Sequence, residues 1–318
     1  MQLRKLFFCV MVGFIGLIPV SIFAQPNSIH VITTFDYPGT GNSTTPFGIN
    51  GHGDIAGRYE SGGVTRGFVR FRNGTFSSPL VAPNDTGGFT AGFGINNART
   101  VGGESFTLAT NTFHGFLWNN GVFTTFDFGG PVSTAVTGVN DAGNFTGAFG
   151  STILPNKGFV NIGGTSTAII VPGAFDSVAY GINSSNRVVG QYRLSPTAVF
   201  HGFIRSPNGT ITNPVDYPGS TSTSLFGIND RGWIVGSYTD AFGHQHGFVR
   251  KNTNTYVSFD FPGSSGTSFN GINNAGLISG RYTDSAGIRH GFIARIRNGH
   301  GDDDDGEGEG EDNDHDDH

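Results

Sequence analysis

The sequence predicts an all-β fold, a six-bladed β-propeller of four-stranded antiparallel blades, and three observations support this prediction. A skeleton made of G-[IV]-N, a glycine seven residues after the Asn, and a later Gly-Phe pair occurs six times. The Asn recurs at intervals of 46, 44, 43, 46 and 44 residues, a length that suits one four-stranded blade. Between the two ends of the chain, no window of about eleven residues shows a helical stripe of apolar side chains.

All six repeats keep the three fixed points of the skeleton. The Asn falls at Asn50, Asn96, Asn140, Asn183, Asn229 and Asn273. The glycine falls at Gly57, Gly103, Gly147, Gly190, Gly236 and Gly280. The Gly-Phe pair ends at Phe68, Phe116, Phe159, Phe203, Phe248 and Phe292. Because a group that supports the fold is needed in every blade, we interpret all three as structural.

Each repeat contains four short segments that read as strands a to d. In the first repeat, strand a ends at residues 47–49, strand b covers 54–59, strand c covers 67–71 and strand d covers 75–81. The a-b turn ends on Gly in four repeats and on Arg99 or Asn186 in the other two, which predicts a left-handed residue at this position. Asn-Gly and Gly-Gly pairs predict tight c-d hairpins.

The two ends of the repeat array predict that the ring is closed. The sixth repeat stops after strand c, at residues 292–296, and so lacks a strand d. Residues 31–37 (VITTFDY) match strand d of the second repeat, residues 122–128 (VFTTFDF). We expect this N-terminal strand to pair with the last blade, which would remove the exposed sheet edges of an open array. An open solenoid with caps is the alternative.

The ends of the chain differ in character from the repeats at residues 25–298. Residues 1–24 carry Arg4 and Lys5 before an apolar run, the layout of a signal peptide cleaved after Ala24, with a retained anchor as the alternative. The single cysteine, Cys9, lies inside this segment, so we expect no disulfide. Residues 299–318 are predicted to be a disordered acidic tail, with weak calcium binding as one role. These features predict a monomer in the extracellular space, at the cell surface or in the periplasm, without a membrane span after signal removal.

The charge distribution argues against a nucleic-acid partner. Of the 24 acidic residues, 11 lie in residues 299–318, which leaves 13 acidic residues elsewhere. Of the 18 basic residues, 16 remain when Arg4 and Lys5 are set aside. A body with so small a basic excess, and with its arginines scattered through the repeats, lacks the basic patch that nucleic-acid binding requires.

The longer connections are predicted to meet on one face, called here the long-loop face. It comprises the d-a loops at residues 38–46, 83–91, 129–136, 172–178, 218–225 and 262–268, and the b-c loops at residues 60–65, 104–112, 149–156, 193–199, 239–245 and 283–288. Since loops on a rigid scaffold commonly carry binding, we expect any site here, around the mouth of the central channel.

Charged residues that occur once on this face are the candidate site residues. Carboxylates can serve glycoside hydrolysis in pairs, and a histidine can move protons, so the catalytic candidates are Glu60, Glu104, Asp240 and His244. The binding candidates are Arg193, Asp284 and Arg289. No nucleophile elbow, zinc-binding motif, phosphate loop or cysteine cluster is present, so the sequence predicts neither a metal nor a cofactor.

The pattern GINNAG-x-[IV]-x-G followed by HGF[LIV], seen at residues 271–293, resembles the HAF-type extracellular repeat of bacterial secreted proteins. The resemblance covers nearly all of residues 25–298. It implies an exported, propeller-like protein and transfers no catalytic residue to this chain.

Together these features predict a secreted, non-enzymatic propeller that binds an extracellular polysaccharide or a protein partner through its long-loop face. Two alternatives remain open at this point. One is a polysaccharide-degrading enzyme, a glycoside hydrolase or lyase, with its site at the channel mouth. The other is a structural protein of the cell envelope.

Overall fold

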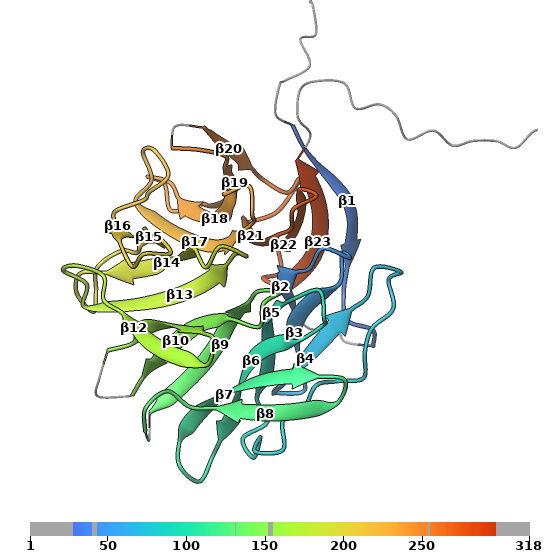
Figure 1. Cartoon of the computed structure of the whole chain (residues 1–318). Coiled ribbons are helices and arrows are strands. Elements are labelled where there is room, and N and C mark those ends of the chain that lie inside the picture. The colour runs from blue at the N-terminus through green and yellow to red at the C-terminus, as the bar shows by residue number, and fades with distance from the viewer. Residues whose placement is uncertain (1–27, 40–42, 131, 152–154, 254, 297–318) are drawn as a thin grey trace, which may run out of the picture.

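The computed structural model describes residues 28–39, 43–130, 132–151, 155–253 and 255–296. All the regular secondary structure in these residues is β-strand (Figure 1). The prediction of an all-β fold is therefore confirmed. The predicted signal peptide and acidic tail lie outside the described residues. Within those residues, the chain forms no helix of the length and hydrophobicity needed to cross a membrane.

Each repeat contributes consecutive strands that pair antiparallel with their neighbours. Repeats one and two form β2 (Thr44–Ile49), β3 (Ile55–Ser61), β4 (Val64–Arg70), β5 (Thr90–Ile95), β6 (Val101–Thr107), β7 (Thr112–Asn119) and β8 (Val122–Phe126). Repeats three and four form β9 (Ser133–Val139), β10 (Phe145–Gly150), β11 (Lys157–Ile162), β12 (Thr165–Ile169), β13 (Asp176–Ile182), β14 (Val188–Arg193), β15 (His201–Arg205) and β16 (Ile211–Thr212). Repeats five and six form β17 (Ser222–Ile228), β18 (Ile234–Thr239), β19 (Gln245–Arg250), β20 (Tyr256–Phe259), β21 (Gly266–Ile272), β22 (Leu277–Thr283) and β23 (Arg289–Ile296).

The prediction of six separate four-stranded sheets is wrong in two places. Three sheets are four-stranded and one, β2-β3-β4, is three-stranded, while the strands of the last two repeats share one eight-stranded sheet with β1 (Ile29–Phe35). A single parallel pair, Gln245 with Gly266, connects the two halves of that sheet. In the first repeat, Pro79 interrupts the predicted strand d, which is reduced to isolated bridges at Phe76 and Leu80.

The predicted closure by the N-terminal strand is confirmed. Strand β1 runs antiparallel to β23, from Ile29 opposite Ile296 to Phe35 opposite Gly291. The innermost strands also contact one another in a cycle, in the order β2, β5, β9, β13, β17, β21 and back to β2 (Figure 1). An open solenoid is therefore excluded, because its first and last repeats would not touch.

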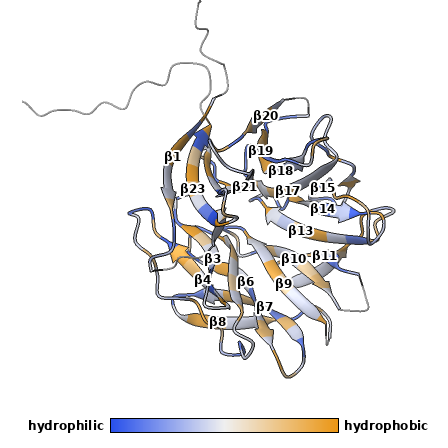
Figure 2. Cartoon of the chain, turned by 180° about the vertical axis from the view of Figure 1, so that it is seen from behind, coloured by the Kyte–Doolittle hydropathy of each residue, from blue (hydrophilic) through white to orange (hydrophobic). Residues whose placement is uncertain are grey.

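The Gly-Phe pair and the strand-b glycine form the core between the sheets. The six Phe side chains of the pair are at most 1% exposed. A Cβ built at any of the six glycines would lie 3.0 Å or less from the ring of the Phe in the same repeat. The glycine is required because the ring occupies the space that a side chain would need. Apolar residues accordingly run along strands such as β4, β7 and β9 (Figure 2).

The six repeated asparagines form a closed ring of hydrogen bonds on the tight-turn side. Each Oδ1 accepts from the backbone N–H four residues later, at 2.8–3.0 Å, which stabilises the a-b turn. Each Nδ2 donates to the backbone oxygen of the Asn in the next repeat, at 2.9–3.2 Å, and Asn273 donates to Asn50. The interpretation of the Asn as a structural residue is confirmed, because it both fixes the turn and links one repeat to the next.

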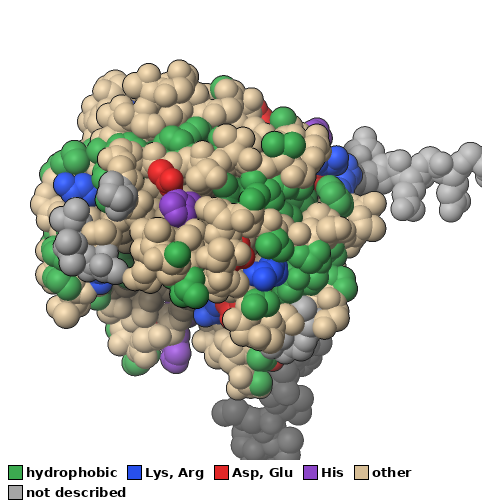
Figure 3. Space-filling view, turned by 90° about the horizontal axis from the view of Figure 1, so that it is seen from below, with side chains coloured by type: hydrophobic (Ala, Val, Ile, Leu, Met, Phe, Trp, Pro, Cys, Tyr) green, Lys and Arg blue, Asp and Glu red, His purple; other side chains and the backbone are tan. Residues whose placement is uncertain are grey.

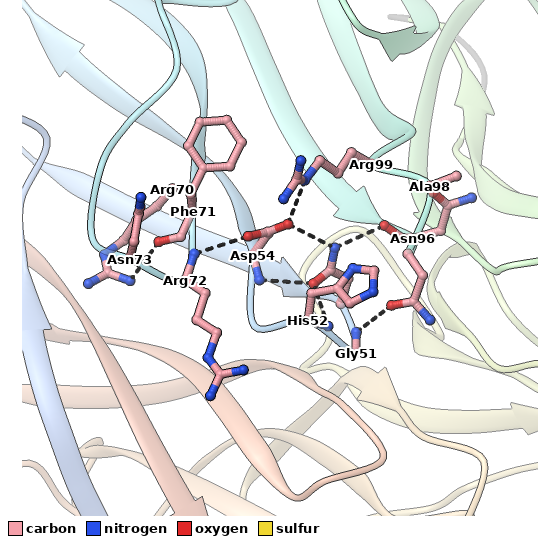
Figure 4. Close-up of polar contacts among 12 residues, drawn as sticks. Gly51, His52, Asp54, Arg70, Phe71, Arg72, Asn73, Asn96, Ala98 and Arg99 are labelled. Atoms are coloured by element: carbon pink, nitrogen blue, oxygen red, sulfur yellow. Dashed lines mark hydrogen bonds and ion pairs between the residues drawn. The ribbon is translucent and has the colours of Figure 1, made fainter.

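The a-b turns adopt the conformation that the sequence predicts. The last turn position has positive φ in all six repeats, including Arg99 at 60° and Asn186 at 61°. In the second turn, Arg99 also reaches back to the preceding repeat, where its Nε lies 2.7 Å from Oδ2 of the buried Asp54 (Figure 4). This ion pair is a second link between repeats one and two.

The histidine that precedes the Gly-Phe pair in four repeats binds within its own blade. His114, His201 and His246 contact Asp127, Asp216 and Asp260 of strand d at 2.6–3.0 Å. In the last blade the partner of His290 is Asp36, at 2.8 Å, which follows β1. The two repeats without this Asp, with Val81 and Ile170, have Arg66 and Lys157 in place of the histidine.

We predict that replacing one ring asparagine destabilises the whole propeller. Asn229→Ala removes the hydrogen bonds to the Trp233 N–H and to the Asn273 carbonyl. The Trp233 N–H loses its acceptor, and the carbonyl keeps only the bond from the Gly276 N–H, at 3.1 Å. The free energy of unfolding in urea should fall by roughly 2–3 kcal/mol. Asn208→Ala, in an exposed hairpin turn, is the control and should change it by less than about 0.5 kcal/mol. Equal effects of the two substitutions would show that the ring is not needed.

We also predict that the closure depends on pH through His290. Burial lowers the pKa of His290, but hydrogen bonds to Asp36 and Asp284 outweigh burial and raise the pKa above 6.5. A histidine with a raised pKa stabilises the fold below its unfolded-state pKa, and this contribution disappears as pH rises through the folded-state pKa. The urea midpoint of His290→Gln should therefore fall further below the parent at pH 5.5 than at pH 8.5. His52→Gln, in an exposed turn, serves as the control; an equal deficit of His290→Gln at both pH values would contradict the prediction.

Candidate functional site

A central cavity of about 580 Å³ lies inside the ring of innermost strands. Side chains from all six repeats line it, so the repeats converge on one space. At one end its lining includes Phe113, Ser133, Asn156 and Arg289, which adjoin the long loops. The cavity therefore reaches the long-loop face, where the sequence predicts the site.

An apolar ring forms the floor of this cavity. The residue before each ring asparagine is branched and only 5–8% exposed. These residues are Ile49, Ile95, Val139, Ile182, Ile228 and Ile272. They also line a shallow hollow on the tight-turn side, together with the asparagines, so they lie between the two spaces. A ligand that entered from the long-loop face would stop at this ring.

The wall above the floor is largely aromatic. It is formed by the residue three positions before each ring asparagine, namely Phe47, Phe93, Thr137, Tyr180, Phe226 and Asn270. The ring centroids of Phe47 and Phe93 lie 4.9 Å apart, and those of Tyr180 and Phe226 lie 5.1 Å apart. Flat apolar faces beside amide and hydroxyl groups suit a ligand with both apolar and polar surfaces.

A second set of positions, immediately after the strand-b glycine, brings charge to the cavity. These positions hold Arg58, Glu104, Ala148, Gln191, Ser237 and Arg281 in repeat order. Successive side chains of a strand point to opposite faces, so a residue beside the packed glycine points away from the Phe. Arg58, Glu104 and Arg281 line the cavity. Its charged side therefore belongs to repeats six, one and two, on either side of the closure.

Arg289 joins the same side of the cavity. One oxygen of Glu60 lies 3.9 Å from a guanidinium nitrogen of Arg58 and 3.8 Å from one of Arg289. These distances indicate ion pairs that are longer than hydrogen bonds. Within the part of the chain that the structure describes, the side chains of Arg281 and Glu104 form no hydrogen bond or close ion pair, and the Nε of Arg58 is buried without a hydrogen-bond partner.

The surroundings of these groups change their acidity. Burial raises the pKa of Glu104 from 4.5 to about 7, although Arg58 acts in the opposite direction. Burial, with the charges of Arg289 and Arg58, lowers the pKa of Arg281 to about 10. Burial raises the pKa of Tyr180 above its usual range, and Glu104 adds to this effect. A proton on Glu104 is therefore exchanged near neutral pH, inside a cavity that also holds arginines.

The structure divides the predicted site residues into two groups. Glu104 and Arg289 line the cavity, and Glu60 lies beside it with 46% of its side chain exposed. Glu104, Glu60 and Arg193 lie in strands β6, β3 and β14, not in loops as predicted. The structure does not bring the other four candidates, Asp240, His244, Arg193 and Asp284, to the cavity lining.

These four residues stabilise loops. Asp240 accepts hydrogen bonds from the backbone N–H groups of Phe242 and His244, and these bonds help to lower its pKa to about 2. Asp284 forms the same turn in the last repeat, with Ala286 and Ile288. His244 is 70% exposed beside Asp240. Arg193 pairs with Asp176 at 2.6 Å. Their contacts therefore explain them as structural residues.

The sequence interpretation missed Arg58, Arg281 and Tyr180, because it searched the loops while these residues lie in strands. A signal was present in the aligned repeats. The position after the invariant glycine, and the position three before the invariant Asn, vary from repeat to repeat within otherwise regular strands. In these strands, a position that differs from repeat to repeat and lies beside an invariant residue holds a side chain that faces the central space and not the core.

The described residues indicate no metal centre. Among the residues described, His, Cys, Asp and Glu do not form a group of three or more that could hold an ion. Calcium binding by residues 299–318 lies outside the described residues and stays a prediction.

Comparisons with known proteins identify only the fold. No family model matches the sequence, and no curated protein matches it. A lectin from Aleuria aurantia, solved in complex with Fucα1-6GlcNAc, is 11% identical, with 80% of this chain and 94% of that chain covered and a TM-score of 0.50. TolB from Acinetobacter baumannii is 10% identical, with 77% of this chain and 65% of that chain covered and a TM-score of 0.51. The chain is similar to these structures in its β-propeller fold.

We predict that Glu104 makes stability depend on pH. Its folded-state pKa lies above its unfolded-state pKa, so the parent should lose stability as pH rises from about 4.5 to about 7. Glu104→Gln removes this loss. The free energy of unfolding of the variant minus that of the parent should therefore be larger at pH 8 than at pH 4, by at most about 3 kcal/mol. Urea unfolding at the two pH values measures it, with the pH 4 pair as the control. Parallel pH profiles of parent and variant would rule out a raised pKa.

Proposed function

We propose that this protein is a six-bladed propeller that binds a saccharide unit of an extracellular polysaccharide in its central cavity, and that it acts by binding and not by catalysis. The observation that carries the proposal is the convergence of unlike side chains from all six repeats on one cavity, above a ring of identical structural groups. In this proposal the eight-stranded sheet counts as two blades that share one pair of residues, Gln245 and Gly266.

The size and lining of the cavity support a saccharide unit as ligand. Binding pockets for small ligands have volumes of about 300–1,000 Å³, and a cavity of about 580 Å³ falls within that range. A sugar ring presents an apolar face to an aromatic side chain and hydroxyl groups to amides and charged groups. Phe93, Phe226 and Asn270 offer these two kinds of contact. The floor of branched side chains favours the end of a chain, or a short branch, as the bound unit.

The outer surface offers fewer features of a binding site. In the face that Figure 3 shows, charged side chains are few and do not gather into a large patch of one sign. The most exposed large apolar side chain among the described residues is Phe242, at 85%, at the tip of a b-c turn. A protein partner on the long-loop face would use such tips, whereas a saccharide would use the cavity. A saccharide ligand and a protein partner would therefore depend on different residues, the first on the cavity lining and the second on the loop tips.

The cavity chemistry fits binding better than glycoside hydrolysis. Hydrolysis by the usual route needs two carboxyl groups on opposite sides of the scissile bond, about 5–10 Å apart. Of the described residues that line the cavity, Glu104 alone carries a carboxyl group. The second candidate, Glu60, lies outside the lining and close to two arginines. No specific observation favours the hydrolase over a binding protein.

The proposal also includes that the protein is exported from the cell and that its repeats are of an extracellular type. A signal peptide at residues 1–24 would deliver the propeller to the cell surface or beyond, where polysaccharides occur. The resemblance of residues 271–293 to the HAF-type extracellular repeat supports export in the same way.

We predict that Phe93→Ala weakens saccharide binding at least about tenfold, because the cavity loses one aromatic face. The full-length protein would be applied to a glycan array, and the best hit titrated by calorimetry against the parent, Phe93→Ala and Phe242→Ala. The last variant is the control, since Phe242 lies at a loop tip outside the cavity. Loss of binding with Phe242→Ala alone would locate the site on the loops. A blank array would count against a saccharide ligand.

A further inference from the structure

We propose that the cavity recognises an anionic group of its ligand through Arg281, Arg58 and Arg289, so that the ligand is an acidic saccharide. This inference rests on the proposed function, because it names the class of saccharide for the same cavity. Three features support it: the position of the arginines, the shortage of negative charge around them, and the neutral character of the opposite wall.

The three arginines come from the two repeats that meet at the closure of the ring. Arg58 lies in β3 of the first repeat, and Arg281 and Arg289 lie in β22 and β23 of the last. These repeats are in direct contact, since Ser279 of β22 donates a hydrogen bond to the Phe47 carbonyl of β2. The closure therefore brings together cationic groups that are more than 200 positions apart in the chain.

The negative charge nearby does not balance these cations. Glu60 stays at 3.8–3.9 Å from Arg58 and Arg289, and nearly half of its side chain is exposed to solvent. Glu104 is uncharged for much of the time near neutral pH, since its pKa is about 7. The Arg281 guanidinium has no hydrogen bond or ion pair with another described residue, although Arg281 lines the cavity. The cavity therefore carries a net positive charge on this side.

An uncompensated cation in a cavity weakens the fold. Removing a charged group from water costs several kcal/mol unless a counter-charge repays it, and like charges add to that cost. The Arg58 guanidinium is partly shielded by the rings of Phe47 and Phe89, at 5.9 and 5.7 Å, but its buried Nε has no partner. A bound anion would supply the missing acceptors to both Arg58 and Arg281.

The opposite wall suits the uncharged part of the same ligand. At the positions equivalent to Arg58 and Arg281, repeats three, four and five have the uncharged residues Ala148, Gln191 and Ser237, of which Ala148 lines the cavity. Tyr180 and Phe226, on this side, provide an aromatic pair. A sugar ring could rest on this pair while its acidic substituent reaches the arginines. The planar guanidinium forms two parallel hydrogen bonds with a carboxylate, so we take a uronic acid as the ligand, and a sulfate ester is the other outcome of the titration.

The test compares an acidic saccharide with its neutral counterpart on the full-length protein. Tri-galacturonate, its full methyl ester and a sulfated chondroitin disaccharide would be titrated by calorimetry at pH 6 against the parent, Arg281→Gln and Arg281→Lys. Arg187→Gln, at an exposed arginine of an a-b turn, is the matched control. The parent should bind the acid at least tenfold more tightly than the ester, and Arg281→Gln should abolish this ratio without weakening the ester. Equal binding of acid and ester by the parent would overturn the inference. Tighter binding of the sulfated probe would show that the recognised anion is a sulfate and not a carboxylate.

A second measurement separates this inference from the proposed function. The unfolding temperature would be measured in sodium sulfate and in sodium chloride of equal ionic strength, with no saccharide present. Sulfate should stabilise the parent more than it stabilises Arg281→Gln. Without any added anion, Arg281→Gln should be at least as stable as the parent, because one repelling charge is removed. If sulfate stabilises the parent more than Arg281→Gln but no saccharide binds, the anion site is supported and the proposed saccharide ligand is rejected. If the parent and Arg281→Gln behave alike in sulfate and in all saccharide titrations, the anion site itself is rejected.

Discussion

The ring of six asparagine side chains is the interaction on which the architecture depends. Each side chain fixes a tight turn through its oxygen and the next repeat through its nitrogen, so local and long-range order come from the same residue. The side chains are 3–6% exposed, and a buried amide without partners costs about 1–3 kcal/mol. The ring can close only because Asn273 reaches Asn50, which requires the first and last repeats to be adjacent. Strand β1 secures this arrangement at the outer edge of the last blade.

Invariant and variable positions of the repeat have different environments. The invariant Gly, Phe and Asn pack against neighbouring strands, where any larger or apolar replacement would clash or leave a polar group unpaired. The positions beside them in the strand point toward the central space, where side chains of different size and charge can be accommodated. Arg58, Glu104 and Arg281 occupy one such position, and the aromatic wall occupies another. A regular scaffold thus presents an irregular lining, with cationic groups beside the seam and neutral groups opposite.

The charged loop residues have mainly structural roles. Asp240 and Asp284 accept hydrogen bonds from the backbone of their own turns, and Arg193 pairs with Asp176. The histidines of strand c also have a structural partner, the Asp of strand d. This pairing was visible in the sequence, because the repeats without the Asp also lack the histidine. It links two strands of one blade, and in the last blade it links β23 to the segment after β1.

The sequence by itself determined the all-β class, the repeat length, the left-handed turn residues and the closing strand, because these follow from local patterns repeated six times. Tertiary structure decided which strands share a sheet, since one pair of residues joins the last two repeats and Pro79 interrupts the first. It also decided which charged residues meet. Glu104 and Arg289 were among the predicted candidates, but Arg58 and Arg281 join them only when the ring closes. Distances between repeats depend on packing around the whole circle, and no local pattern in the chain encodes them.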